Sequence, residues 1–211
     1  NGFGTVGFTH LSGEDDGRSY GIQGQTNDSW RGDQLSKFGA QLSYGITDTL
    51  GVTVQATAKA QQDEWKANLE WAYLSYELTD KLTIQAGRKR IPLYYYSEFQ
   101  DVGFAYSWLR PPQTLYGWEA SNYNGANLRY SDNLGNWSLT ANVYAGSETV
   151  DDAPYNDLYD TISQDSRWDK IRGLDIEVNK DWFTARLIYM TSENSTTERP
   201  DSKAYYSPAT D

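Results

Sequence analysis

Two pairs of carboxylates in this chain of 211 residues are placed where they could do chemistry. The pairs are Glu64 with Glu70, and Asp175 with Glu177. Paired carboxylates hydrolyse glycosidic bonds when an apolar pocket keeps one of them protonated. No residue near either pair indicates such a pocket. The two pairs therefore support only an alternative interpretation, a carbohydrate-binding or carbohydrate-active extracellular β-sandwich protein.

Acidic residues also gather in two predicted connections. Residues 12–33 contain Glu14, Asp15 and Asp16, and residues 147–169 contain Glu148, Asp151, Asp152, Asp157, Asp160, Asp165 and Asp169. Clustered carboxylate oxygens are the ligands that Ca²⁺ prefers. Neither cluster has the regular spacing and the glycine of a dedicated calcium loop. We therefore expect solvated surfaces here, and no resident metal or cofactor.

The composition excludes several other kinds of site. The chain has no cysteine and a single histidine, His10, so thiolate and paired-imidazole sites are absent from the sequence. A net charge of -11 argues against nucleic acid as a partner, because phosphate binding needs clustered basic residues. The mean hydropathy of -0.74 argues against membrane-spanning helices.

Alternation with a period of two residues runs through most of the chain and predicts β-strands. The clearest segment is 137–145, in which one face carries Trp137, Leu139, Ala141, Val143 and Ala145 and the other carries Ser138, Thr140, Asn142 and Tyr144. The apolar face of such segments is rich in Leu, Val and Ala, and the opposite face is small and polar. Nine strands are predicted in this way, at 3–11, 37–46, 50–60, 65–78, 82–90, 124–131, 137–147, 170–179 and 183–192.

The connections between these strands alternate in length. Tight polar turns are predicted at 47–49, 79–81, 132–136 and 179–181, whereas three of the four other connections are long, at 12–33, 91–123 and 147–168. This order is typical of an antiparallel up-and-down meander with short turns at one end, as in transmembrane β-barrels. Small polar residues fill a soluble core badly but suit a water-filled lumen. Aromatic residues beside the turns fit an interfacial girdle: Tyr44, Tyr76, Trp137, Trp182 and Phe183.

Four motifs between residues 70 and 117 resemble Gram-negative outer-membrane porins. They are the runs Glu70 to Tyr76, Leu82 to Arg88, Pro92 to Tyr94, and Trp108 to Pro112. The resemblance is closest to proteobacterial porins whose third loop carries an aromatic stretch with Arg-Pro-Pro. It covers about a quarter of the chain by motif, and most of the chain by strand pattern.

The resemblance implies a trimeric barrel of about 16 strands, whose third long loop folds into the lumen and narrows it. Such porins place basic side chains on the wall opposite acidic side chains on that loop. By position, Arg88 matches the wall arginine, and the other constriction candidates are Lys89, Arg90, Arg110, Glu98 and Asp101. Trp108 belongs to the same aromatic loop, in which Tyr94, Tyr95 and Tyr96 either line the loop or pack against the wall.

The function expected from these observations is a porin of the bacterial outer membrane, which is not an enzyme. It passes small hydrophilic solutes and ions passively, and forms a homotrimer surrounded by outer-membrane lipid and lipopolysaccharide. Divalent ions held by the acidic connections could bridge lipopolysaccharide phosphates. Charge selectivity is left open by the sequence.

The length does not suit a complete barrel. Nine strands in 211 residues use about 23 residues each, so a barrel of about 16 strands would need roughly 370. The chain is also expected to end in a loop rather than in a terminal strand. We therefore expect one transmembrane β-barrel domain over residues 1–211 that is incomplete at its C-terminus.

Overall fold

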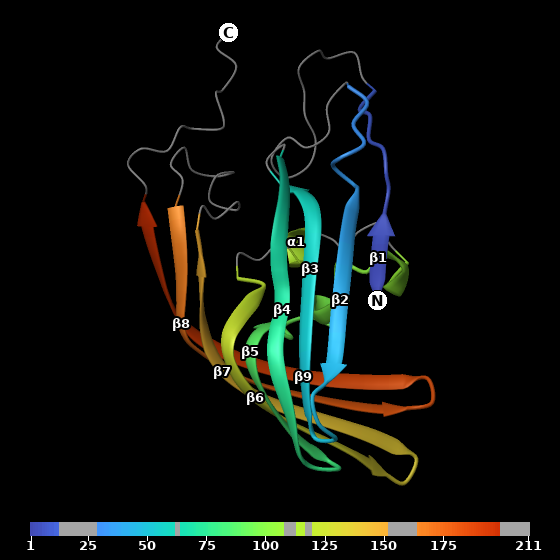
Figure 1. The fold of residues 1–211 in the computed structure, drawn as a ribbon, viewed down its shortest axis with the longest axis vertical. Coiled ribbons are helices and arrows are strands. Elements are labelled where there is room, and N and C mark those ends of the chain that lie inside the picture. The colour runs from blue at the N-terminus through green and yellow to red at the C-terminus, as the bar shows by residue number, and fades with distance from the viewer. Residues whose placement is uncertain (13–28, 62–63, 108–112, 117–119, 152–163, 199–211) are drawn as a thin grey trace.

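Nine antiparallel strands form one sheet in the computed structural model of this chain (Figure 1). The structure describes residues 1–12, 29–61, 64–107, 113–116, 120–151 and 164–198. Every strand is hydrogen-bonded only to its neighbours in chain order, which makes the sheet an up-and-down meander. The strands are β1 (Gly2–Thr5), β2 (Lys37–Gly45), β3 (Leu50–Gln61), β4 (Glu64–Thr79), β5 (Leu82–Arg90), β6 (Asn122–Leu134), β7 (Trp137–Val150), β8 (Gln164–Lys180) and β9 (Phe183–Glu198).

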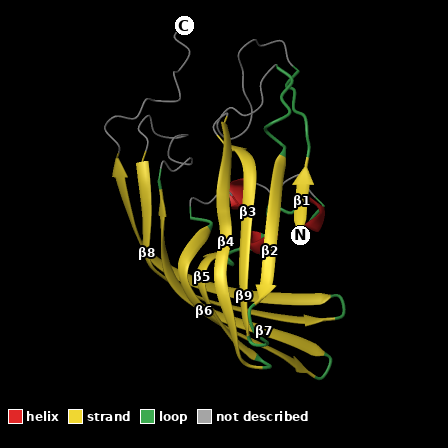
Figure 2. Cartoon of the chain, in the orientation of Figure 1, coloured by secondary structure: helices red, strands yellow, loops and turns green. Residues whose placement is uncertain are grey.

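Short turns join the strands at one end of the sheet, and the remaining connections lie at the other end (Figure 2). The turns fall at the predicted positions, but the one between β6 and β7 is tighter than expected. The ladder continues to Leu134 opposite Trp137, so only Gly135 and Asn136 turn the chain. Gly135 has a φ of +64°, a conformation that glycine adopts without a steric penalty.

Three short helices lie in the connection between β5 and β6. They are η2 (Ser97–Phe99), η3 (Gly103–Ala105) and α1 (Gln113–Tyr116). No helix in the described ranges has the length and apolar character needed to cross a membrane.

The sequence predicts all nine strands in order, and it misplaces several ends. β1 stops at Thr5, and beyond it only the bridge between Thr9 and Arg31 continues the predicted segment. β8 begins at Gln164 rather than at residue 170, because backbone pairing with β7 and β9 needs no apolar side chain. Residues 164–169 are polar except for Trp168, so no alternation marks this part of the strand.

The sheet is open. β1 and β9 form its two edges and are not hydrogen-bonded to each other. These nine strands therefore form an open antiparallel sheet and do not close into a barrel.

The two faces of the curved sheet differ in polarity. The convex face carries large apolar side chains that are exposed, such as Leu42, Leu74, Leu187 and Tyr189, of which Leu187 is 64% exposed. The concave face carries polar side chains that are buried, such as Gln55 at 5% exposure. Among the described residues, 13 polar or charged residues are buried, against 6 hydrophobic ones and Pro92. This is the reverse of a water-soluble core.

A row of three glycines crosses the middle of the sheet. Gly87 of β5 is paired with Gly125 of β6, which is paired with Gly146 of β7. A side chain on Gly87 would overlap the backbone of β4 at Ala72 and Tyr73, and Gly87 itself has a φ of +137°. The row therefore allows neighbouring backbones to approach closely.

The aromatic residues predicted to form a girdle lie at the end of the sheet with the short turns. Trp137 of β7 packs edge-on against Phe183 of β9, with ring centroids 6.0 Å apart, and Phe183 contacts Trp182 at 6.1 Å. Trp182 is 91% exposed, and Tyr44 and Tyr76 are also exposed. The structure thus places exposed aromatic rings at one end of the sheet, on β2, β4, β7, β9 and the β8–β9 turn.

We predict that Gly125→Ala lowers the free energy of unfolding in detergent by about 1–3 kcal/mol. The added methyl group would lie 2.6 Å from the Gly146 Cα and would force the backbones apart. Gly45→Ala is the matched control, because the nearest atom there, the Thr47 carbonyl oxygen, lies 3.8 Å away. Urea unfolding followed by tryptophan fluorescence measures both changes. Equal midpoints for the two variants would show that the glycine row is not required.

Candidate functional site

The described parts of the connection between β5 and β6, residues 91–107, 113–116 and 120–121, include segments that contact the concave face. At one side, Arg186 of β9 donates hydrogen bonds to the Pro92 carbonyl oxygen at 3.2 Å and the Tyr94 carbonyl oxygen at 3.4 Å. At the other side, Lys37 of β2 donates to the Gln100 carbonyl oxygen at 3.3 Å. Figure 2 shows one short helix of this connection beside the edge strand β1 and the others near β3 and β4. The connection therefore lies against strands that are far apart in the sheet.

A buried ion cluster holds the middle of the connection to the wall. The Arg90 guanidinium contacts both Glu70, with Nη2 and Oε2 2.8 Å apart, and Asp101 of the connection. Lys59 lies 3.6 Å from Glu70 and 3.5 Å from Asp101. The Arg90 side chain is 2% exposed. Two cations face two carboxylates here, so the charges inside the cluster are balanced.

The strand geometry that forms the cluster includes a β-bulge in β4. Gln55 pairs with Trp71 and Ala56 with Leu69, which leaves Glu70 as the extra residue. Glu70 accepts a hydrogen bond from Thr57 Oγ1 at 2.7 Å. A bulge redirects a side chain out of regular alternation. The bulge therefore brings the Glu70 carboxylate to the concave face beside Arg90.

The ionisation of Asp101 depends on this cluster. Burial alone would raise the pKa of the Asp101 carboxyl, but the positive charges of Lys59, Arg90 and Lys37 outweigh burial and lower the pKa to about 2. Burial raises the pKa of Tyr106 to about 12, so its hydroxyl stays protonated. That hydroxyl donates to the Gln100 carbonyl oxygen at 2.7 Å.

Both ends of the connection pack against an apolar cluster. Ile91 and Ala120 are buried with Tyr123 and Tyr144, and with Trp168 and Ile171 of β8. This cluster fixes the two ends of the connection, while the ion cluster fixes its middle.

The three predicted basic residues of β5 have separate surroundings. Arg88 binds Glu148 through Nη2 at 2.7 Å and donates through Nε to the Leu69 carbonyl oxygen at 2.7 Å. Lys89 donates to Asn127 Oδ1 at 3.2 Å and lies 5.0 Å from the centre of the Tyr73 ring. Arg90 belongs to the buried ion cluster. The consecutive cations therefore do not act as one basic group.

The two predicted acidic residues of the connection also differ. Asp101 is in the ion cluster, whereas Glu98 in η2 acts on Lys89 through its charge without forming an ion pair with it. Arg110 and Trp108 lie outside the described residues.

The tyrosines of the connection pack mainly on one another. Tyr96 is the centre, with ring centroids 5.0 Å from Tyr95, 5.5 Å from Phe99 and 5.8 Å from Tyr106. Tyr94 packs on Tyr116 at 5.2 Å. Of the three consecutive tyrosines, Tyr95 is 50% exposed, whereas Tyr94 and Tyr96 are partly buried. The aromatic stretch therefore forms the interior of the connection, with Tyr95 at its surface.

A ladder of amides crosses the concave face beside Lys89. Asn127 of β6 donates to Gln85 Oε1 of β5 at 3.1 Å and to Asn142 Oδ1 of β7 at 2.8 Å. Arg129 is the next residue of β6 on the same face, and it is exposed. Within the part of the chain that the structure describes, neither Lys89 nor Arg129 forms an ion pair with a carboxylate. The site thus contains two cations whose charges are not neutralised by direct pairing.

Sequence reasoning did not assign roles to Lys37, Lys59, Arg129 or Arg186. Their common signal is a charged residue at a concave-face position of an alternating strand, but this signal does not reveal which carboxylate lies opposite.

Three of the four carboxylates considered for hydrolysis lie beside cations, and the side chain of the fourth, Glu64, is outside the described part of the structure. Glu70 faces Arg90, and Asp175 contacts Arg186 at 3.3 Å. Glu177 lies 4.0 Å from the same arginine. Among the residues that the structure describes, no group of three or more histidine, cysteine or carboxylate side chains could hold a metal ion. Most of the acidic stretches at 14–16 and 151–165 lie outside the described ranges.

Comparisons with protein-family models, with curated proteins and with solved structures found no match.

We predict that Asp101→Asn loosens the connection and increases hydrogen exchange of residues 97–106. The substitution leaves Arg90 with one carboxylate fewer, and breaking a buried pair costs about 3 kcal/mol. Glu98→Gln is the matched control, because Glu98 is outside the cluster. Equal exchange in the two variants would contradict the anchoring role.

The same cluster makes the attachment of the connection to the sheet sensitive to acid. Because the pKa of Asp101 is lowered, its contribution to stability is complete above the ordinary value near 4 and is lost as the pH falls through about 2. Exchange of residues 97–106 should therefore rise between these pH values in the native protein and stay constant in Asp101→Asn.

Proposed function

We propose that this chain is part of an outer-membrane porin, a water-filled channel through which small hydrophilic solutes and ions diffuse passively. The observation that carries the proposal is the reversed polarity of the sheet, with apolar side chains exposed on the convex face and polar side chains buried on the concave face. Large contiguous apolar surfaces are unfavourable in water, and lipid removes that penalty.

The strand lengths agree with this proposal. A strand that crosses a bilayer at a tilt needs about 9–11 residues. β2 and β5 have 9 residues each, and β4 has 16. Open edges are not tolerated in lipid, because their backbone groups would lack hydrogen-bond partners. The proposal therefore requires further strands beside β1 and β9, in a closed barrel of about 16 strands that assembles as a homotrimer.

The connection across the concave face is the proposed constriction. In a narrow pore with walls of low dielectric constant, a few fixed charges act strongly on a passing ion. Arg90 and Lys59 are balanced by Glu70 and Asp101, and Arg186 is balanced by Asp175. Lys89 and Arg129 lack such partners among the described residues, so they favour anions in the channel.

We expect the membrane-extracted protein to migrate differently in gels before and after boiling, and to form open channels in planar bilayers. A closed barrel resists detergent until it is heated, and a polar lumen conducts ions. Extraction without detergent, with an unshifted band and no conductance, would overturn the porin proposal.

We further expect Lys89→Gln with Arg129→Gln to lower the anion-to-cation permeability ratio by about twofold or more. Reversal potentials in a salt gradient measure this ratio. Lys81→Gln with Lys180→Gln removes the same charge at the turns and serves as the control. An unchanged ratio in the first variant would contradict the proposed role of Lys89 and Arg129.

A further inference from the structure

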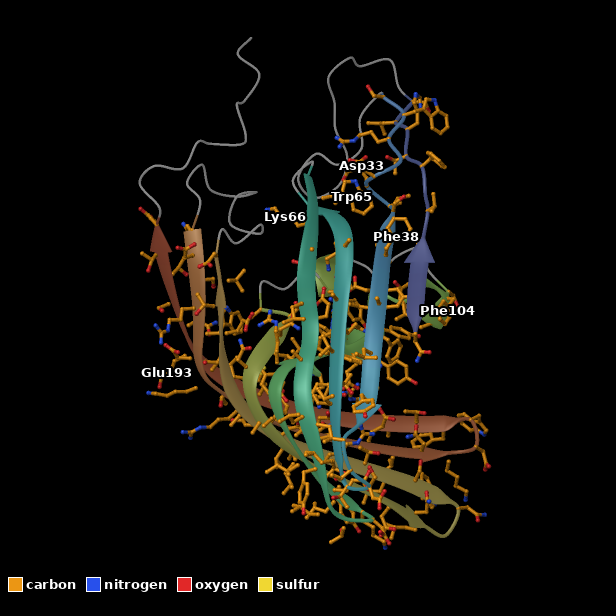
Figure 3. All side chains as sticks on the ribbon, in the orientation of Figure 1. Asp33, Phe38, Trp65, Lys66, Phe104 and Glu193 are labelled. Atoms are coloured by element: carbon orange, nitrogen blue, oxygen red, sulfur yellow. The ribbon has the colours of Figure 1, made fainter. Side chains whose placement is uncertain are left out.

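Three basic residues lie on the convex face of β8 between residues 167 and 172. Arg167 pairs through Nε with Asp169 at 2.7 Å, and Lys170 pairs with Glu193 of β9 at 2.8 Å. Arg172 forms no hydrogen bond or ion pair with any residue in the described ranges. Both members of the Lys170–Glu193 pair are more than 60% exposed. Figure 3 shows Glu193 projecting outward from the sheet.

These residues lie directly beyond the apolar part of the convex face. Leu174 of β8 is paired with Tyr189 of β9, and the next convex pair along the strands is Arg172 with Thr191. The change from apolar to charged side chains therefore occurs within one step of the ladder. In a membrane-spanning sheet, this step marks the boundary between hydrocarbon and lipid headgroups.

A local distortion of β8 places Arg172 on this face. The register with β9 shifts between Asp169 and Arg172, and Lys170 has a φ of 51°, which is uncommon for a residue other than glycine. The shift directs Ile171 to the concave face, where it is fully buried, and Arg172 to the opposite face. Unbroken alternation from Trp168 would have placed Arg172 on the concave face.

We propose that Arg167, Lys170 and Arg172 bind the phosphate groups of an anionic lipid at the membrane boundary. This inference rests on the proposed function, because it requires the sheet to span a membrane. Asp165, Asp169 and Glu193 share this face with the three cations, and Arg172 is the one of these cations that forms no ion pair with a described carboxylate. Guanidinium groups bind phosphate through two parallel hydrogen bonds, and ammonium groups act as point charges. Exposed ion pairs are weak, so their cations exchange readily for a phosphate.

Native mass spectrometry of the detergent-purified protein tests the proposal with diphosphoryl lipid A and its dephosphorylated form as probes. The native protein should retain the diphosphoryl lipid preferentially. Lys170→Gln with Arg172→Gln should reduce this retention about fivefold. Lys81→Gln with Lys180→Gln, which removes the same charge at the short turns, should retain as much lipid as the native protein.

A second variant gives the opposite change. Glu193→Gln removes the carboxylate paired with Lys170, so retention of the diphosphoryl lipid should increase. Equal losses in the two lysine-containing double variants, or equal retention of both lipids by the native protein, would overturn the proposal. Heat-modified migration and conductance of the same samples test the channel proposal separately from the lipid-site proposal. If the protein shows heat-modified migration and conductance while the substitutions leave retention of the diphosphoryl lipid unchanged, the lipid-site proposal is wrong and the channel proposal is still supported.

Discussion

The Arg90 guanidinium, buried between Glu70 and Asp101, is the interaction on which the arrangement of the concave face depends. A buried arginine is stable only when carboxylates neutralise it, so the strand residue Glu70 and the connection residue Asp101 must both be in place. Because Asp101 belongs to the connection, the same requirement draws that segment onto the sheet. Lys37 and Arg186 then hold its flanks from β2 and β9.

The curvature of the sheet makes this contact possible. The row of Gly87, Gly125 and Gly146 lets adjacent backbones approach where side chains would collide. Polar groups that would face open solvent on a flat sheet are thereby buried and must find partners. The amide ladder of Gln85, Asn127 and Asn142 provides these partners without adding charge.

Much of the fold could be predicted from local patterns. The strand 137–147 is recognisable because Trp137, Val143 and the residues between them alternate, and β7 spans this segment in the structure. The first part of β8 could not be predicted, because Gln164 to Asp169 carry polar side chains whose strand pairing depends on β7 and β9. For the candidate site, the sequence located the charged segment 88–101 without distinguishing the balanced Arg90 from the unpaired Lys89.

The sequence by itself determined the order of the strands, the positions of the turns and the opposite chemistry of the two faces, since alternation and turn residues are properties of neighbouring residues. Only the tertiary structure decided which charges meet. Glu70 reaches Arg90 through a bulge, and Arg172 reaches the convex face through a shift of register. Both depend on how one strand pairs with another. Pairing of this kind brings together residues that are distant along the chain, and no local pattern specifies it.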